Sequence, residues 1–505
     1  GDGAGTAVEP RGGETIAGIL DRNSHRIGVA DAGARRVARD SCVLLLMAQK
    51  HKWLWILWSV VTLAMSGMAP YILTGSDRRF LLPGETTSGH YQIELACSAC
   101  HTPWLGVKED ACYKCHEAEL KAANDSHPKS KFIDPRNADR LQLIKADNCV
   151  ACHREHVPHQ TGAMGVTVPI DYCAHCHQQT LTDRPSHKNF KFDSCATAGC
   201  HNYHDNSALY ENFLLKHAQE PAVKDSGTVA QRQLLAFLTA DGVMKPRPAL
   251  TAEQQDAPAN VTANAKVKED WLTTAHAKAG VNCTDCHNIE DAATREKRWS
   301  DKLAPNACTR CHKEEVNGFL AGKHGMRLAL DLPPMTPAQS RLPMKADAAH
   351  HELGCVSCHG AHEFNTRTAA VDACLSCHND EHSLAYKDSK HFALWFNETT
   401  GEAPAGSGVS CATCHLPREK IENAGHVMVR VQHNQNANLR PNEKMIRSVC
   451  MDCHGLEFSL DALADPALIC TNFIGRPARH VESIDLAVKR QMEIQKQKSK
   501  PRTEK

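Results

Sequence analysis

The sequence predicts a mainly α-helical chain with extensive loops. Hydrophobic residues make up 42% of the 505 residues but aromatic residues only 5%, which is little for a conventional core of side chains. The chain also holds 24 cysteines and 31 histidines, which recur in close succession along most of its length. Glycine, proline and asparagine are frequent around them and indicate loops. A chain of this length is expected to form about two to four domains. With so few aromatic residues, its core is expected to contain a bound group in addition to side chains.

One short pattern, Cys-x-x-Cys-His, recurs ten times, and a variant with four residues between the cysteines occurs once. It is the attachment signal for c-type haem, in which two thiols bond covalently to the porphyrin and the adjoining histidine is the proximal ligand of the iron. The motifs predict eleven haem c groups, and a haem stack would supply the missing core. The attachment residues are Cys97, Cys100 and His101; Cys112, Cys115 and His116; Cys149, Cys152 and His153; Cys173, Cys176 and His177; Cys195, Cys200 and His201; Cys283, Cys286 and His287; Cys308, Cys311 and His312; Cys355, Cys358 and His359; Cys374, Cys377 and His378; Cys411, Cys414 and His415; and Cys450, Cys453 and His454.

Other uses of these cysteines are disfavoured. Zinc ribbons contain Cys-x-x-Cys pairs but do not require a histidine after every second cysteine. A disulfide framework is typical of short secreted domains and not of a chain of 505 residues. Cys42 and Cys470, the two cysteines outside the motifs, are expected to be inert thiols.

The charge balance also excludes several function classes. Lysine plus arginine equals aspartate plus glutamate at 58 each, and no basic stripe is present, so nucleic acid is not an expected partner. The sequence has no phosphate loop and no dinucleotide fingerprint, which argues against direct ATP or nicotinamide chemistry.

The N-terminal part has two segments. Residues 1–46 precede the first methionine, Met47, and we expect them to be a disordered extension without a role in function. Residues 47–76 contain an uncharged run from Trp53 to Gly75, which is long enough for an N-terminal transmembrane helix. Basic residues before the run orient the N-terminus to the cytoplasm. A cleaved signal peptide is the alternative. Either segment would export the rest of the chain, which predicts the inner (cytoplasmic) membrane as its location, with the haem domains in the periplasm or outside the cell.

Residues 77–217 are predicted to form a pentahaem domain. Each iron needs a distal ligand, and histidines outside the motifs are the candidates. His156 lies three residues beyond its proximal His153, so it cannot reach the far face of the same porphyrin and must serve a neighbouring haem. The same argument applies to His204, His362 and His382. The distal ligands predicted in this domain are His90, His127, His156, His187, His204 and His217.

The dense motifs and interleaved histidines of this domain resemble the class III multihaem cytochromes. That resemblance implies electron transfer. A membrane anchor followed by several haems is also similar to the multihaem quinol dehydrogenases, which implies a quinol-linked donor, although the residues around the first haem do not match that family.

Residues 218–270 contain no cysteine or histidine and are rich in proline, alanine and glutamine. They are predicted to be a linker with a short helix across Val229–Thr239. The boundary between two haem domains is expected here.

Residues 271–505 carry six motifs and form the predicted hexahaem domain. The succession CTRCHKEEVNGFLAGKHG, GCVSCHGAH and GVSCATCHLP resembles the hydroxylamine oxidoreductase and octahaem reductase superfamily. The resemblance implies that the haem at Cys308, Cys311 and His312 takes the place of the family's five-coordinate catalytic haem. His312 stands where related nitrite reductases have a lysine, and no tyrosine follows Cys453 to form the family's porphyrin cross-link, so hydroxylamine oxidation is not expected.

Distal ligands in the hexahaem domain are drawn from ten histidines outside the motifs. Family position favours His276, His324, His391 and His433. His351, His362 and His382 complete the predicted set. The tail over residues 488–505 has seven basic and two acidic residues, and is expected to be a solvated end or a dock for an acidic redox partner or lipid headgroups.

Two functions fit these features. The predicted one is a membrane-anchored conduit that carries electrons along mostly bis-histidine haems between a membrane donor and a periplasmic acceptor, with redox proteins or a quinol-linked donor as partners. The alternative is a terminal reductase of a small nitrogen or sulfur oxyanion (nitrite, hydroxylamine or tetrathionate) at an open haem bound by Cys308, Cys311 and His312. A protein that stacks into arrays is a third possibility. The first two differ in whether one iron has a vacant face, which would be high-spin.

Overall fold

The structure is a computed structural model that describes residues 52–499 apart from residues 69, 71–78, 124–126, 128–131, 133–134, 136–137, 144, 147, 163–164, 185–186, 188–202, 205–208, 226, 260–264, 291–293, 424–425 and 440–443. The predicted extension 1–46 and the longer motif at Cys195, Cys200 and His201 therefore lie outside the described residues. The chain divides into two compact units, Gly1–Leu81 and Leu82–Lys505.

In the first unit, residues 52–68 form a helix whose side chains are all exposed. Trp53, Trp55, Trp58 and Leu63 have between 60% and 73% of their surface exposed. Among the described residues, no helix is both long enough and apolar enough to span a bilayer. The predicted transmembrane span is thus not supported, and its last part falls within residues 71–78, outside the described chain.

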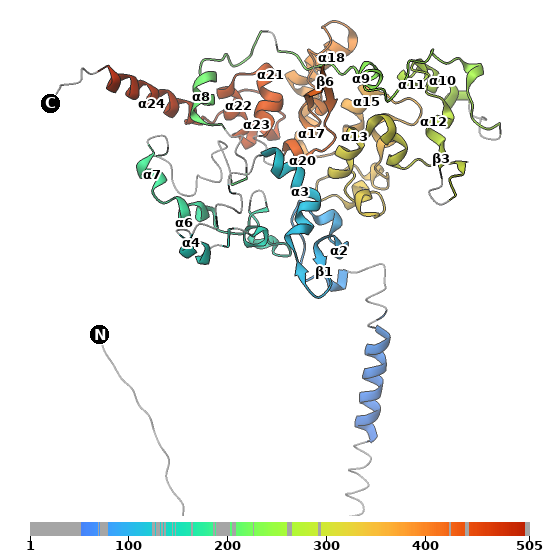
Figure 1. The fold of residues 1–505 in the computed structure, drawn as a ribbon, viewed down its shortest axis with the longest axis horizontal. Coiled ribbons are helices and arrows are strands. Elements are labelled where there is room, and N and C mark those ends of the chain that lie inside the picture. The colour runs from blue at the N-terminus through green and yellow to red at the C-terminus, as the bar shows by residue number, and fades with distance from the viewer. Residues whose placement is uncertain are drawn as a thin grey trace, which may run out of the picture. The chain divides into compact units, whose positions relative to one another are not determined.

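The second unit is mainly helical, as predicted, and its helices are short and joined by loops (Figure 1). Its first part begins with α2 at the first haem motif and ends with α8. The helices here are α2 (Cys97–Cys100), α3 (Glu109–Ala123), α4 (Ala138–Leu143), α5 (Cys149–Cys152), α6 (Ala174–His177), α7 (Thr180–Asp183) and α8 (Glu211–His217), and the strands are β1 (His101–Thr102) and β2 (Gly106–Val107).

The second part of this unit includes three helices of more than ten residues, α13, α18 and α24. The helices are α9 (Leu234–Ala240), α10 (Ala265–Thr273), α11 (Ala275–Lys278), α12 (Cys283–His287), α13 (Thr309–Ala321), α14 (Cys355–His359), α15 (Thr366–Ala370), α16 (Asp372–Leu375), α17 (Glu381–Ala385), α18 (Lys390–Thr400), α19 (Cys411–His415), α20 (Asn436–Leu439), α21 (Met451–Cys453), α22 (Leu456–Leu463), α23 (Pro466–Cys470) and α24 (Ser483–Lys498). The strands are β3 (Asn288–Glu290), β4 (Lys297–Trp299), β5 (Arg418–Asn423) and β6 (His426–Val431).

The strands pair only as antiparallel hairpins among the described residues. β1 pairs with β2, β3 with β4 and β5 with β6, and no described strand joins two hairpins. In the longest hairpin Arg418 lies opposite Val431 and Asn423 opposite His426. Helices and loops therefore position the functional residues, and no extended sheet takes part.

Several haem motifs begin a helix at their first cysteine. The residue before that cysteine has an extended backbone at α5, α12 and α19, and its side chain accepts a hydrogen bond from the first turn at Asn148, Asn282 and Ser410. Within one helical turn, residues three apart lie on the same side. The helix start therefore presents both thiols of a motif in one direction.

Side chains alone make a small core. The largest fully buried side chains are Ile446, Leu456 and Ser459. One cluster joins α8, α22 and α24, which lie beside one another in Figure 1, through Leu214, Leu460 and Ile484. A second cluster surrounds Tyr386 next to the α19 motif. Such sparse clusters fit a chain whose interior is filled by a bound group.

The segment 218–270, predicted to be a linker, contacts the C-terminal part of the chain at several points. Lys224 donates a backbone hydrogen bond to the Cys453 carbonyl at 2.8 Å, and Val229 donates one to Gly406 at 2.8 Å. Gly227 packs so closely against the last motif that an added Cβ would lie 2.7 Å from Cys453 Cα. Its described helix, α9, starts at Leu234 rather than at Val229.

Candidate haem sites

Every proximal histidine that the structure describes faces the ring of a second histidine. The ring centroids lie 5.9–6.4 Å apart in ten such pairs. Each pair joins one motif histidine to one histidine outside the motifs. The pairs are His101–His156, His116–His90, His153–His204, His177–His127, His287–His362, His312–His276, His359–His433, His378–His324, His415–His382 and His454–His391.

This separation fits two ligands on one iron. A metal bound by a histidine lies about 2 Å from the ring nitrogen, so rings on opposite sides of one metal have centroids roughly 6 Å apart. Two histidine rings in direct contact would have no room for an atom between them. The spacing therefore suits a bis-histidine iron in each pair.

A hydrogen bond at one nitrogen of a histidine ring determines which nitrogen is left to bind iron. At seven of these histidines Nδ1 lies against a backbone carbonyl, so Nδ1 carries the proton and Nε2 is left unprotonated as a ligand. The carbonyls belong to Tyr203 for His127 (2.7 Å), Gly165 for His153 (3.2 Å), Gly84 for His156 (2.8 Å), Ser300 for His287 (2.7 Å), Ile469 for His382 (2.5 Å), Val431 for His433 (2.9 Å) and Ala222 for His454 (2.7 Å).

Burial keeps the rings neutral in the C-terminal part. It lowers the pKa of His312, His324, His359, His391 and His415 to about 4. An imidazole must be deprotonated at the binding nitrogen to hold a metal. These five rings therefore have the protonation state of ligands at neutral pH.

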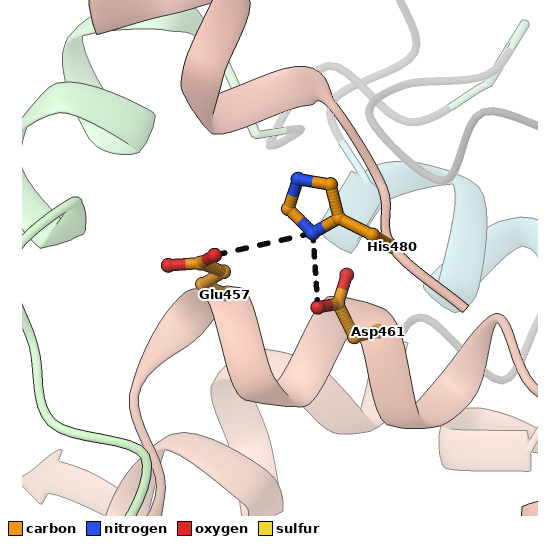
Figure 2. A group of neighbouring side chains, drawn as sticks. All are labelled: Glu457, Asp461 and His480. Atoms are coloured by element: carbon orange, nitrogen blue, oxygen red, sulfur yellow. Dashed lines mark hydrogen bonds and ion pairs between the residues drawn. The ribbon is translucent and has the colours of Figure 1, made fainter. Parts of the chain in front are cut away.

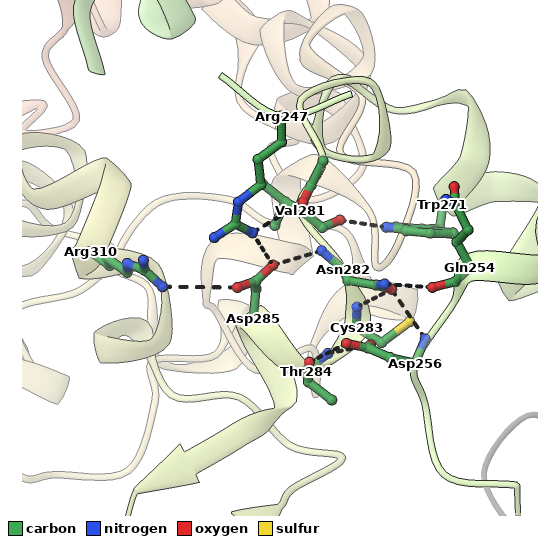
Figure 3. Close-up of polar contacts among 11 residues, drawn as sticks. Arg247, Gln254, Asp256, Trp271, Val281, Asn282, Cys283, Thr284, Asp285 and Arg310 are labelled. Carbon is green, nitrogen blue, oxygen red and sulfur yellow. Dashed lines mark hydrogen bonds and ion pairs between the residues drawn. The ribbon is translucent and has the colours of Figure 1, made fainter. Parts of the chain in front are cut away.

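A network of polar contacts holds the motif at α12 (Figure 3). Asn282 Oδ1 accepts from the Cys283 amide at 2.9 Å, and Asp285 Oδ2 accepts from the Asn282 amide at 2.9 Å. Arg247 donates to Asp285 at 3.1 Å, and the Asp256 carboxylate accepts from the Thr284 amide at 2.9 Å. Residues of the segment 218–270 thus help to fix the start of a haem motif.

The space around the C-terminal motifs is large and apolar. A connected cavity of about 2260 Å³ is lined by Cys283, Cys286, Cys308, Cys311, Cys355, Cys358, Cys374, Cys377, Cys411 and Cys414 with their histidines. A pocket for one small molecule measures about 300–1,000 Å³, so this one suits several porphyrins. Arg418 Nη1, on the same lining, is buried and has no hydrogen-bond partner among the described residues. A haem propionate is the kind of group that would satisfy it.

Comparison with protein families relates part of the chain to a known family. The cytochrome c3 family is similar to residues 89–178, which hold four of the Cys-x-x-Cys-His motifs. Together with the paired rings, this match decides the class of the protein. The chain is a multihaem c-type cytochrome. The searches of curated proteins and of solved structures gave no match.

Consecutive motifs of the cytochrome lie next to one another. The side chains of Cys112 and Cys149 lie close enough to interact, and so do those of Cys308 and Cys355 and of Cys374 and Cys411. Cys286 neighbours Cys308, Cys358 neighbours Cys374, and Cys414 neighbours Cys450 closely enough to act electrostatically. From Cys283 to Cys453 the attachment sites therefore follow one another in space in the order of the sequence.

Ten of the thirteen predicted distal histidines of the cytochrome face a proximal one. His351 does not: it is exposed and its ring faces no described proximal histidine. The Nδ1 atom of His217 bonds to Glu220 at 2.8 Å, and its ring contacts Phe213 at 4.4 Å. His201, the remaining proximal histidine, lies outside the described residues, so the roles of His187 and His217 stay predictions.

A separate group of possible metal ligands lies outside these sites (Figure 2). His480 Nδ1 lies 3.2 Å from Asp461 and 3.9 Å from Glu457, and Nε2 lies 2.7 Å from Asp485. Hydrogen bonds to Asp485 and Asp461 raise the pKa of His480 to about 9. The ring is therefore protonated at neutral pH, and the group is an ion-pair cluster that joins α22 to the start of α24 rather than a metal site.

Proposed function

We propose that this cytochrome is an electron conduit with eleven haem c groups, mostly bis-histidine, anchored in the inner membrane and exposed to the periplasm. The attachment residues are those of the eleven motifs, and the axial ligands are the ten described ring pairs. The observation that carries the proposal is that each described proximal histidine is opposed by a second ring. Six-coordinate iron has no place for a substrate, so such haems transfer electrons.

The order of the sites supports conduction. Electrons move between cofactors that lie close together, and consecutive motifs from Cys283 to Cys453 have neighbouring thiols. The protein's part is to space the haems and to set their potentials through ligands, hydrogen bonds and burial.

The terminal reductase has less support. It requires a vacant face at the haem of Cys308, Cys311 and His312. The ring of His276 lies at that face, 6.0 Å from His312 between centroids. No described proximal histidine has an open side, so a small oxyanion such as nitrite is not the proposed substrate.

The membrane anchor is part of the proposal. It is supported by the uncharged run from Trp53 to Gly75 and by the exposed tryptophans of residues 52–68. A redox protein or a quinol-linked donor would deliver electrons from the membrane side, since haem c is attached outside the cytoplasm. Recovery of the mature chain in the soluble periplasmic fraction alone would contradict the anchor.

Electron paramagnetic resonance tests the conduit. The fully oxidised protein is expected to show only low-spin ferric signals, unchanged by nitrite, because both axial positions are filled by histidine. Mass spectrometry of the same sample should give the polypeptide plus eleven haems. A high-spin signal that nitrite alters would instead favour the reductase.

A further inference from the structure

The site formed by His90 and His116 differs from the other described sites in its outer contacts. Both of its Nδ1 atoms face carboxylates, whereas seven other ligands face neutral backbone carbonyls and His378 has one carboxylate, Asp380, at 3.6 Å. The two rings lie 5.9 Å apart and are inclined at 69°. Among the described pairs, no other has a carboxylate at both histidines.

Glu155 makes the stronger of the two contacts. Its Oε1 lies 2.7 Å from His90 Nδ1, and its Oε2 accepts from the Thr87 amide at 2.6 Å. The Thr87 hydroxyl donates to Oε1 at 2.9 Å, so the carboxylate is held on three sides. Among the described residues, no lysine or arginine forms an ion pair with Glu155.

Glu119 makes the second contact from within α3. It follows His116 by three residues, and its Oε2 lies 3.5 Å from His116 Nδ1. Its other oxygen pairs with Lys444, which offsets part of its charge. Glu155 is therefore expected to influence its histidine more than Glu119 does.

A carboxylate at Nδ1 changes what the histidine gives to a metal. It draws the Nδ1 proton toward itself and makes the ring a more basic, more anionic ligand. Such a ligand favours ferric over ferrous iron and lowers the reduction potential, whereas a backbone carbonyl does so less. We infer that the haem attached at Cys112 and Cys115, with His116 and His90 as axial ligands, has the most negative potential of the described sites.

The position of this haem suggests what its low potential does. This step rests on the proposed electron conduit. His90 lies in a segment that the C-terminal part of the chain holds: Lys323 donates to the Ser88 carbonyl, and Arg327 donates to the Gln92 carbonyl at 2.7 Å. Lys323 precedes His324, a ligand in the C-terminal group. The most reducing haem therefore lies where electrons pass between the two groups of haems, and it acts as the uphill step between them.

Glu155→Gln tests the inference, because glutamine keeps the size and the acceptor oxygen but removes the charge. We expect a potentiometric titration, monitored by electron paramagnetic resonance, to show a higher reduction potential for the lowest-potential haem. The increase should be about 59 mV, which corresponds to about tenfold in a one-electron redox equilibrium. The rings of this site are inclined at 69°, which separates its signal from that of near-parallel pairs such as His287–His362 at 16°. Other described pairs are crossed at 70–80°, so the response to Glu155→Gln is what identifies the haem among them. Glu119→Gln should raise the reduction potential of the same haem by a smaller amount.

Glu94→Gln is the matched control. Glu94 lies on the same segment and pairs with Arg341 at 3.9 Å but contacts no ligand, so the potentials should stay as they are. An unchanged lowest potential in both the Glu155 and Glu119 variants, with full haem content, would overturn the inference while leaving the conduit intact. The conduit itself would fail on a different result, missing haem or a high-spin signal in the unsubstituted protein.

Discussion

His276 is the residue that separates the two candidate functions. Its ring faces His312, and burial lowers its pKa, so the imidazole is neutral. Its Nδ1 is buried without a hydrogen-bond partner among the described residues, so its protonation is not fixed by a carbonyl as it is at His287. Its position opposite a motif histidine, rather than hydrogen bonding, is therefore the reason to propose it as a distal ligand.

Replacing this residue should open one iron. In His276→Ala the haem at Cys308 and Cys311 loses its distal ligand, and we expect a high-spin ferric signal from one haem and binding of carbon monoxide by the reduced protein. His351→Ala is the control, because that exposed ring faces no described proximal histidine. A variant at His276 that remains entirely low-spin would show that another group holds the site.

At the scale of elements, apolar packing and specific polar contacts together dock a helix on its neighbours. α24 is an example: Ile484 and Ala487 pack it against α8 and α22, and Arg490 pairs with Glu211 at 2.7 Å. The His480 cluster fixes its first turn through Asp485. This docking depends on the charge of one histidine.

The attachment of α24 should therefore depend on pH. The folded state raises the pKa of His480 from 6.5 to about 9, so the stabilisation is fully present below pH 6.5 and is lost as the pH rises through about 9. Because the ring is 45% exposed, solvent screening limits the effect to about 1 kcal/mol or less. Hydrogen exchange in α24 should speed up between pH 7 and pH 10, beyond the intrinsic increase.

His480→Gln supplies the comparison for that measurement. The variant should exchange faster than the original at pH 7 and should show no further loss of protection as the pH rises. Equal pH dependence in the two proteins would mean that the cluster does not hold the helix.

At the scale of the whole molecule, the haems replace a core of side chains. The buried apolar side chains form only small clusters, and they leave a large cavity around the C-terminal motifs. Several contacts between distant segments, such as Lys444 with Glu119 and Arg341 with the Thr86 carbonyl, are polar. Polar contacts of this kind contribute little on their own.

The polypeptide without haem should therefore not fold. When it is produced without haem attachment, we expect a far-ultraviolet circular dichroism spectrum with little helix and no cooperative thermal transition, because burial of the porphyrins provides most of the driving force. The mature protein, measured in the same buffer, is the reference. A cooperative transition in the haem-free chain would contradict this account of the core.

The attachment sites could be predicted from the sequence because their chemistry is local. Two thiols and a histidine must lie within a few residues of one another to meet one porphyrin, so each motif is a short contiguous stretch. The same reasoning excluded His156 as the distal ligand of the haem bound by His153, because the two residues are only three apart. In the structure His156 faces His101 instead. The mainly helical class followed from these motifs and from the low aromatic content.

Which histidine faces each motif histidine was decided only by the tertiary structure. His433 reaches His359 and His391 reaches His454 across many residues of chain, while His351, close to a motif in sequence, points to solvent. Likewise, the segment 218–270 has the composition of a linker, yet its backbone bonds to Cys453 and Gly406. A distal ligand is defined by its position in the folded chain. The residues around a motif therefore do not show which distant histidine lies opposite it.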